Sequence, residues 1–166
     1  LHSFHQKVIL IVGGYDKHIP FDVLGPEVCA HVKALILCGA TAAKIRAAVE
    51  SAPGYKAGTP DILEAHTLAE AVKLARSTAK PGDIVTLSPA CAAFDQFKNF
   101  AVRGNTYKQL VNALRKEHAM KLSNLLRKAQ SVKQKLEHPY TAAVIVAAGS
   151  ATRMGGVDKI FAPIAK

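Results

Sequence analysis

The 166-residue sequence has little of what marks disulfide-rich, zinc-binding or membrane-spanning proteins. It contains only three cysteines and no Cys-x-x-Cys pair, which argues against a disulfide framework and against a thiolate zinc site. The seven histidines are scattered without metal-ligand spacing, so we expect no metal site. No apolar run approaches the roughly 18 residues of a membrane span, and no segment of the signal-peptide type opens the sequence. We therefore expect a cytoplasmic protein without membrane contact.

Acidic residues are also few, since 12 Asp and Glu stand against 22 Lys and Arg and leave a formal net charge of +10. Such an excess can indicate binding to nucleic acid. However, eight of the basic residues lie between residues 105 and 138, with only Glu117 and Glu137 among them. We interpret this segment as a solvated basic helix, and the alternatives are contact with nucleic acid or with a membrane surface. We do not expect nucleic acid as a partner.

Short, continuously apolar runs rich in β-branched residues alternate with amphipathic patterns along the chain. Such runs are typical of strands that are covered on both faces, and they lie at residues 7–12, 33–38, 84–88 and 142–148. The helices predicted between them cover residues 42–51, 67–79, 96–103 and 106–137, with a break at Gly104. Thr41 and Thr67 are the predicted N-caps, and Glu70 completes a capping box. The alternation predicts an α/β fold with a Rossmann-like, mostly parallel sheet, a long basic helix and a trailing strand.

Two of the predicted strands end in turns that suit an anionic ligand. The first runs into Gly13-Gly14-Tyr15-Asp16-Lys17, a glycine turn that delivers one ammonium group. The strand at residues 84–88 continues into Pro89-Ala90-Cys91-Ala92-Ala93, whose small side chains let backbone N–H groups approach an anion at the start of a helix. If these strands are neighbours, their ends form a pocket for a small carboxylate or phosphate.

Several residues near these turns also have a structural interpretation. Ser88 either contacts the ligand or caps the following helix. Cys91 is expected to be a packed thiol rather than a nucleophile, because no histidine accompanies it. Phe94, Phe97 and Phe100 are expected in the core first, with one or two of them also forming a pocket wall.

A third strand, at residues 142–148, opens into a loop of small residues with cations, a type of segment that binds nucleotide phosphates. The loop contains Gly149, Ser150, Arg153 and Lys159, and it matches neither the Walker pattern nor Gly-x-Gly-x-x-Gly.

These segments resemble two known families joined in tandem. Residues 7–114 resemble the C-terminal domain of the Mur ligases, within them the branch specific for D-glutamate, through GGYDK, PGDIVTLSPACAAFDQFKNF and the Arg-Gly pair that follows. Residues 142–166 resemble the start of the cytidylyltransferase of the methylerythritol phosphate route to isoprenoids, through VIVAAGSATRMG and Lys159. We accordingly divide the chain into a ligase C-terminal domain (1–114) that lacks its first strand, a basic helical linker (115–139) and a truncated cytidylyltransferase-like start (140–166).

The first resemblance implies a ligase of peptidoglycan and cell-wall synthesis that uses ATP and Mg²⁺ to add D-glutamate to UDP-N-acetylmuramoyl-L-alanine through an acyl phosphate. ATP and Mg²⁺ would be bound mainly by N-terminal and central domains that this sequence does not contain, so the fragment alone would be inactive. The resemblance implies that Lys17 holds a carboxylate of D-glutamate and that Phe94 and Phe100 wall the pocket. It also places Ala93 where the family commonly has a serine that meets a substrate carboxylate.

The second resemblance implies an alternative function, in which the chain belongs to a bifunctional protein or to a cytidylyltransferase acting on CTP and methylerythritol phosphate. The upstream domain would then serve as a scaffold. Gly149 and Ser150 would lie along the CTP phosphates, while Arg153 and Lys159 would neutralise charge that develops on them.

Overall fold

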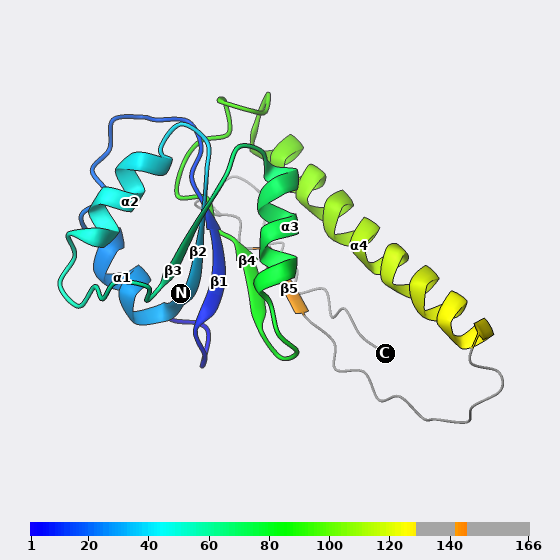
Figure 1. Ribbon diagram of the computed structural model, residues 1–166. Coiled ribbons are helices and arrows are strands. Elements are labelled where there is room, and N and C mark those ends of the chain that lie inside the picture. The colour runs from blue at the N-terminus through cyan, green and yellow to red at the C-terminus, as the bar shows by residue number, and fades with distance from the viewer. Residues whose placement is uncertain (129–141, 146–166) are drawn as a thin grey trace.

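A five-stranded parallel sheet lies at the centre of the protein, in a computed structural model that describes residues 1–128 and 142–145, with side chains described for residues 1–120. The strand order is β3-β2-β1-β4-β5 (Figure 1). The strands are β1 (Val8–Val12), β2 (Val32–Cys38), β3 (Asp61–Ala65), β4 (Ile84–Leu87) and β5 (Ala142–Ile145). The α/β fold with a parallel sheet that the sequence predicts is confirmed.

Helices cover both faces of the sheet, and each face has its own apolar core (Figure 1). The helices are α1 (Leu24–His31), α2 (Ala42–Glu50), α3 (Leu68–Thr78) and α4 (Phe100–Lys128). Val8, Leu10 and Val12 of the central strand β1 face α1 and α2, whereas Ile9 and Ile11 face α3 and α4. Because both faces of β1 are covered, its sequence is a continuous apolar run rather than an alternating one.

Two elements, α1 and β3, are not predicted by the sequence patterns. Helix α1 contains Gly25 and Pro26, residues that normally indicate a turn, but proline is tolerated in the first turn of a helix. A Cβ on Gly25 would lie 2.4 Å from the carbonyl oxygen of Ala48, so the glycine allows α1 and α2 to pack closely. Strand β3 is an edge strand with a mostly exposed or half-buried sequence, and it therefore lacks the apolar run of a central strand.

The predicted helix start at residue 96 and the predicted break at Gly104 are wrong, whereas residues 100–103 are helical as predicted. Residues 96–99 form turns and bends, and α4 begins at Phe100, where the Asn99 side chain accepts a hydrogen bond of 2.9 Å from the Val102 N–H. The helix then continues through Gly104. A glycine inside a helix costs only about 1 kcal/mol relative to alanine, which the packing of Tyr107 against the sheet offsets.

The first turns of α4 pack on the domain and the following ones are solvated. Tyr107 is buried, and Leu110, Val111 and Leu114 pack against the same core. Residues 115–120 are exposed on every side of the helix, as expected for the start of the basic segment. Among the residues whose structure is described, no helix is long and apolar enough to cross a membrane.

Strand β5 adds to the same sheet as the ligase-like segment. Its residues pair in parallel with β4, from Ile84 opposite Ala142 to Leu87 opposite Ile145. Residues 142–145 therefore contribute an edge strand to this sheet. The placement of the domain boundaries at residues 114 and 139 stays a prediction.

The two predicted helix caps behave differently. The Thr67 side chain accepts a hydrogen bond from the Glu70 N–H (3.2 Å), while Glu70 accepts one from the His66 N–H (2.8 Å), so α3 begins much as expected. Thr41 occupies the N-cap position of α2, but its hydroxyl makes no capping bond. That hydroxyl is used in the candidate site instead.

Candidate functional site

The candidate site lies at the carboxyl ends of β1 and β4, which are neighbours in the sheet. From β1 the chain continues to β2 and β3 on one side of β1, whereas β4 and β5 lie on its other side. The strand order therefore reverses between β1 and β4. Ligands of open α/β sheets bind at such a reversal, outside the carboxyl ends of the strands. Two segments meet here: the turn of residues 13–17, which follows β1, and the loop of residues 88–99, which follows β4.

Backbone hydrogen bonds join the 13–17 turn directly to the 88–99 loop. The Gly13 N–H donates to the carbonyl of Pro89 (2.8 Å), and the Tyr15 N–H donates to the carbonyl of Ala92 (3.0 Å). The rings of Tyr15 and Phe94 meet edge to face, with centroids 6.2 Å apart and planes at 80°. The two segments that sequence analysis selected are therefore one structural unit.

Thr41 closes this unit from the β2 side. Its buried hydroxyl accepts a hydrogen bond from the Gly14 N–H (3.1 Å), donates to the Gly14 carbonyl (3.2 Å) and lies 3.2 Å from the Cys91 sulfur. Three successive N–H groups, those of Gly13, Gly14 and Tyr15, thus have protein acceptors. These three amides are therefore occupied within the protein and are not available to an anionic ligand.

Close backbone packing explains why glycines occupy this turn. Gly13 has φ +116°, and a Cβ there would lie 2.0 Å from the carbonyl oxygen of Cys38. Gly14 has φ +148°, and its Cβ would lie 2.4 Å from the carbonyl oxygen of Ala92. The glycines serve the contact between neighbouring strand ends, not an approach to a ligand.

Arg103 attaches helix α4 to the 88–99 loop. Its guanidinium donates to the carbonyls of Ala92 (Nη1, 3.0 Å) and Cys91 (Nη2, 2.9 Å). Burial lowers the pKa of Arg103 from its ordinary value. No local sequence pattern predicts this role for Arg103, although the residue belongs to the Arg-Gly pair that carries part of the family resemblance.

Asp95 and Gln96 attach the same loop to the ends of β2 and β3. A carboxylate oxygen of Asp95 accepts a hydrogen bond from the Ala40 N–H (3.4 Å), and the Gln96 amide donates to the carbonyl of His66 (3.0 Å). Beneath them is a cavity of about 20 Å³, lined in part by Phe97 and Arg103. That volume holds about one water molecule, so this cavity is too small for a larger ligand.

A family model for the Mur ligase, glutamate ligase domain matches residues 1–91, which is more than half of the chain. The chain belongs to the Mur ligase family. The matched segment begins at residue 1 and includes the 13–17 turn, Thr41 and the start of the 88–99 loop.

Curated relatives extend the match beyond the family model. The chain is 51% identical over 114 residues to a UDP-N-acetylmuramoylalanine--D-glutamate ligase of Clostridium botulinum (strain Alaska E43 / Type E3), covering 69% of this chain and 25% of that protein. Proteins of the same name from Clostridium kluyveri (strain NBRC 12016) and Clostridium perfringens (strain 13 / Type A) are 51% and 47% identical over 112 residues, covering 68% of this chain and 24% of each. The chain spans about a quarter of the length of these relatives.

The predicted ligand residues of the Mur ligase segment differ in their solvent exposure. Lys17 is exposed and makes no hydrogen bond or ion pair with the described residues, whereas its neighbour Asp16 is paired with Lys44. Phe94 and Phe100 are 62% and 75% exposed. The expectation that these two phenylalanines lie in the core is wrong, because the loop carries Phe94 outward and Phe100 is exposed at the start of α4.

The remaining predicted residues, Ala93 and Ser88, are less exposed. Ala93 is only 2% exposed, and its carbonyl accepts hydrogen bonds from the N–H groups of Gln96 and Phe97. Ser88 is half-buried, and its N–H donates to the carbonyl of Ile11 (3.1 Å). Ser88 cannot cap α4, which begins only at Phe100.

The three cysteines are free and the thiol nearest the site is packed, as expected. Cys91 is half-buried against Thr41, and burial raises the pKa of its thiol. Cys38 lies beneath the 88–99 loop, and burial raises its pKa as well. Protonated thiols are poor nucleophiles, so both cysteines act as small packing residues here.

The predicted phosphate-binding residues of the second family lie outside the described residues. They are Gly149, Ser150, Arg153 and Lys159. Their role stays a prediction.

Proposed function

We propose that this chain is the amino-acid-docking domain of an ATP-dependent ligase that adds D-glutamate to UDP-N-acetylmuramoyl-L-alanine in peptidoglycan synthesis. The relatives carry this activity in their names and are about half identical to the chain over two thirds of its length. The observation that carries the proposal is the joined pair of strand ends, in which the exposed Lys17 follows two residues after Tyr15, whose N–H is bonded to the 88–99 loop.

The chemistry of the outer surface suits a dicarboxylic amino acid. Lys17 supplies a positive charge, and within the described residues the N–H groups of Phe94 and Asp95 donate to no protein acceptor. A charge-assisted hydrogen bond contributes about 1.5–3 kcal/mol. We propose that these groups hold one carboxylate of D-glutamate and that Ser88 and the backbone at Ala93 lie along the same ligand.

The exposed aromatic rings suit the rest of such a site. Tyr15, Phe94 and Phe100 are 45%, 62% and 75% exposed, which is unusual for rings next to one another in sequence or space. We propose that Phe94 and Phe100 wall the amino-acid pocket when the remaining ligase domains close over it. The domain would then hold the amine of D-glutamate close to the activated acyl group and contribute by orientation.

We propose that ATP and Mg²⁺ are bound by the rest of the enzyme. ATP and Mg²⁺ would act in the part of the ligase that corresponds to the other three quarters of the relatives. Three amides of the 13–17 turn, those of Gly13, Gly14 and Tyr15, are already hydrogen-bonded, which agrees with a domain that contacts the amino acid and not the phosphates.

A chimera tests the proposal. Residues 1–114 of this chain would replace the matching quarter of the Clostridium botulinum ligase, and phosphate release would be measured with ATP, UDP-N-acetylmuramoyl-L-alanine and D-glutamate. We expect release that requires D-glutamate. The absence of D-glutamate-dependent release from a folded chimera would contradict the proposal.

The Lys17→Ala variant of the chimera tests the site itself. Loss of a charge-assisted bond of about 1.5–3 kcal/mol raises the KM for D-glutamate about ten- to hundredfold, with little effect on the KM for ATP. The matched control is Lys73→Ala, which removes an exposed lysine from helix α3. Equal KM values for the two variants would show that Lys17 does not bind the substrate.

A further inference from the structure

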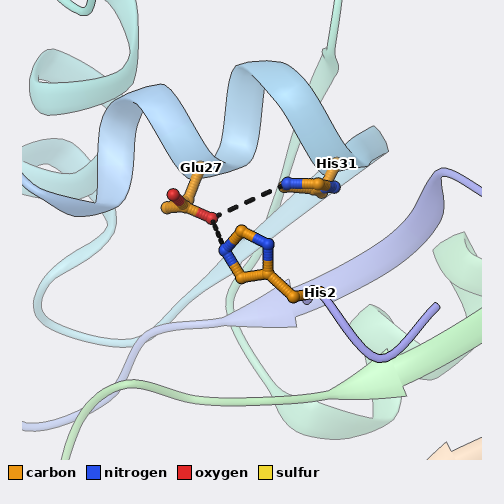
Figure 2. Close-up of side chains that lie close together, drawn as sticks. All are labelled: His2, Glu27 and His31. Carbon is orange, nitrogen blue, oxygen red and sulfur yellow. Dashed lines mark ion pairs between the residues drawn. The ribbon is translucent and has the colours of Figure 1, made fainter.

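His2, Glu27 and His31 gather on the surface with their side chains directed toward one another (Figure 2). The Nε2 atom of His2 lies 2.7 Å from Oε2 of Glu27, and Nε2 of His31 lies 3.8 Å from the same oxygen. The two imidazole rings meet edge to face, with centroids 4.7 Å apart. All three candidate ligand atoms are within 4.8 Å of one another.

Two independent features of the fold bring these side chains together. Glu27 and His31 are four residues apart on α1, so they project from the same face of the helix. His2 comes from the segment before β1, which is anchored because Leu1 and Phe4 both pack against the core under α1. The Phe4 N–H also donates to the Leu1 carbonyl (3.1 Å), which forms a turn that carries the His2 imidazole over the helix.

We propose that these three residues form a binding site for a divalent cation of the zinc class. Two imidazoles and one carboxylate suit Zn²⁺, Ni²⁺, Co²⁺ or Cu²⁺, whereas Mg²⁺ and Ca²⁺ require mainly oxygen ligands. Ligands at about 2.0–2.1 Å from a tetrahedral zinc ion are about 3.3 Å apart. The separations of 2.7 and 3.8 Å from the Glu27 oxygen bracket this value, so small side-chain rotations complete the site.

The exposure of the three side chains leaves room for a water molecule as the fourth ligand. Their exposed fractions are 75% for His2, 43% for Glu27 and 32% for His31. The cluster lies at the amino ends of the strands, because His31 immediately precedes β2 and the His2 segment leads into β1. It is therefore at the edge of the sheet opposite the candidate substrate site. The bound cation would fasten the segment before β1 to α1 and would take no part in the ligase reaction.

Metal titration of the tag-free 166-residue chain tests the site, with Co²⁺ as a spectroscopic probe and Zn²⁺ as the competitor. We expect absorption bands of Co²⁺ bound to nitrogen and oxygen ligands at one equivalent, and their displacement by Zn²⁺ but not by Mg²⁺. His2→Ala, Glu27→Gln and His31→Ala each remove one ligand and should weaken Zn²⁺ binding about tenfold or more. The matched control is His5→Ala, which removes an exposed histidine of the same segment and should leave binding unchanged.

The outcomes separate a metal site from an ordinary ion pair between histidine and glutamate. Zn²⁺ should raise the thermal unfolding temperature of the parent chain and of His5→Ala, but not of the three ligand variants. Circular dichroism checks that each variant is folded, as expected for exposed side chains. Equal Zn²⁺ affinity in the parent chain and in the His2→Ala/His31→Ala double variant, or the absence of Co²⁺ bands in the parent chain, would overturn the proposal.

Discussion

Arg103 is the residue whose replacement should most directly loosen the candidate site without touching the proposed ligand contacts. Its guanidinium is half-buried between α4 and the 88–99 loop and donates to the carbonyls of Cys91 and Ala92 at 2.9 and 3.0 Å. The substitution Arg103→Met keeps most of the apolar stem and removes both donors. The Cys91 and Ala92 carbonyls then lose their partner in a half-buried position.

The size of the effect follows from these two bonds. Each hydrogen bond from a charged donor contributes about 1.5–3 kcal/mol. Burial of the guanidinium has an opposing cost, since burial lowers the pKa of Arg103, and removal of the charge recovers that cost. We therefore expect a net loss of about 2–3 kcal/mol in the free energy of unfolding, which corresponds to a fall of about 8 °C in Tm.

Urea unfolding of the 166-residue chain measures this change, and Arg115→Met provides the control. Arg115 is exposed on the same helix beyond the last turn that packs on the sheet, so its replacement should change stability by less than about 0.5 kcal/mol. In the chimeric ligase, Arg103→Met should also raise the KM for D-glutamate, because the loop that presents Phe94 is no longer attached to α4.

An equal urea midpoint for Arg103→Met and Arg115→Met would refute the reasoning. It would mean that the 88–99 loop is held by its bonds to the 13–17 turn alone. If Arg103→Met lowers the urea midpoint but leaves the KM for D-glutamate unchanged, Arg103 stabilises the fold without affecting substrate binding.

Two further substitutions test the packing and electrostatics of the fold. Gly13→Ala should lower the free energy of unfolding in urea by about 4 kcal/mol or more, because its Cβ would lie 2.0 Å from the Cys38 carbonyl oxygen. The control is Gly58→Ala, which has φ +80° but open space around it and should cost only about 1–2 kcal/mol. Equal losses for the two variants would contradict the close approach at Gly13. Burial raises the pKa of Asp83, but the hydrogen bonds from Lys33 (2.6 Å) and from the Lys80 N–H (2.7 Å), together with the charges of both lysines, outweigh burial and hold that pKa below 3.8. The carboxylate therefore stabilises the fold above that pH, and the contribution is lost as pH falls through the lower native pKa. Asp83→Asn should therefore be about 1 kcal/mol less stable than the parent at pH 7 and equally stable near pH 2, and a difference in urea midpoint that persists at pH 2 would contradict this assignment.

Local patterns predict the centre of the fold well. The runs at residues 7–12, 33–38 and 84–88 become β1, β2 and β4 with boundaries that differ by at most one residue. Each strand is mostly apolar, apart from Lys33 in β2 and Thr86 in β4, because helices cover both faces of the sheet. Edge strand β3 lacks this signal, and α1 is hidden by Gly25 and Pro26, whose usual meaning is reversed by close packing against α2.

The start of α4 shows where local patterns fail. Residues 96–99 have helix-compatible composition, but tertiary bonds hold this segment in turns, since Gln96 binds the end of β3 and Asn99 caps the helix at its actual start. The 88–99 loop carries Phe94 and Phe97, which the sequence alone places together in the core. The loop directs Phe97 inward and Phe94 outward.

The order of apolar and amphipathic segments along the chain is enough to determine a parallel α/β sheet and the two turns that meet at its carboxyl edge, because these depend on the periodicity of neighbouring residues. Tertiary structure alone decides that Thr41 and Arg103 close the site and that His2 reaches Glu27 and His31. These contacts join segments far apart in the chain, and their distances depend on how strands and helices pack. No local pattern of residues contains that information.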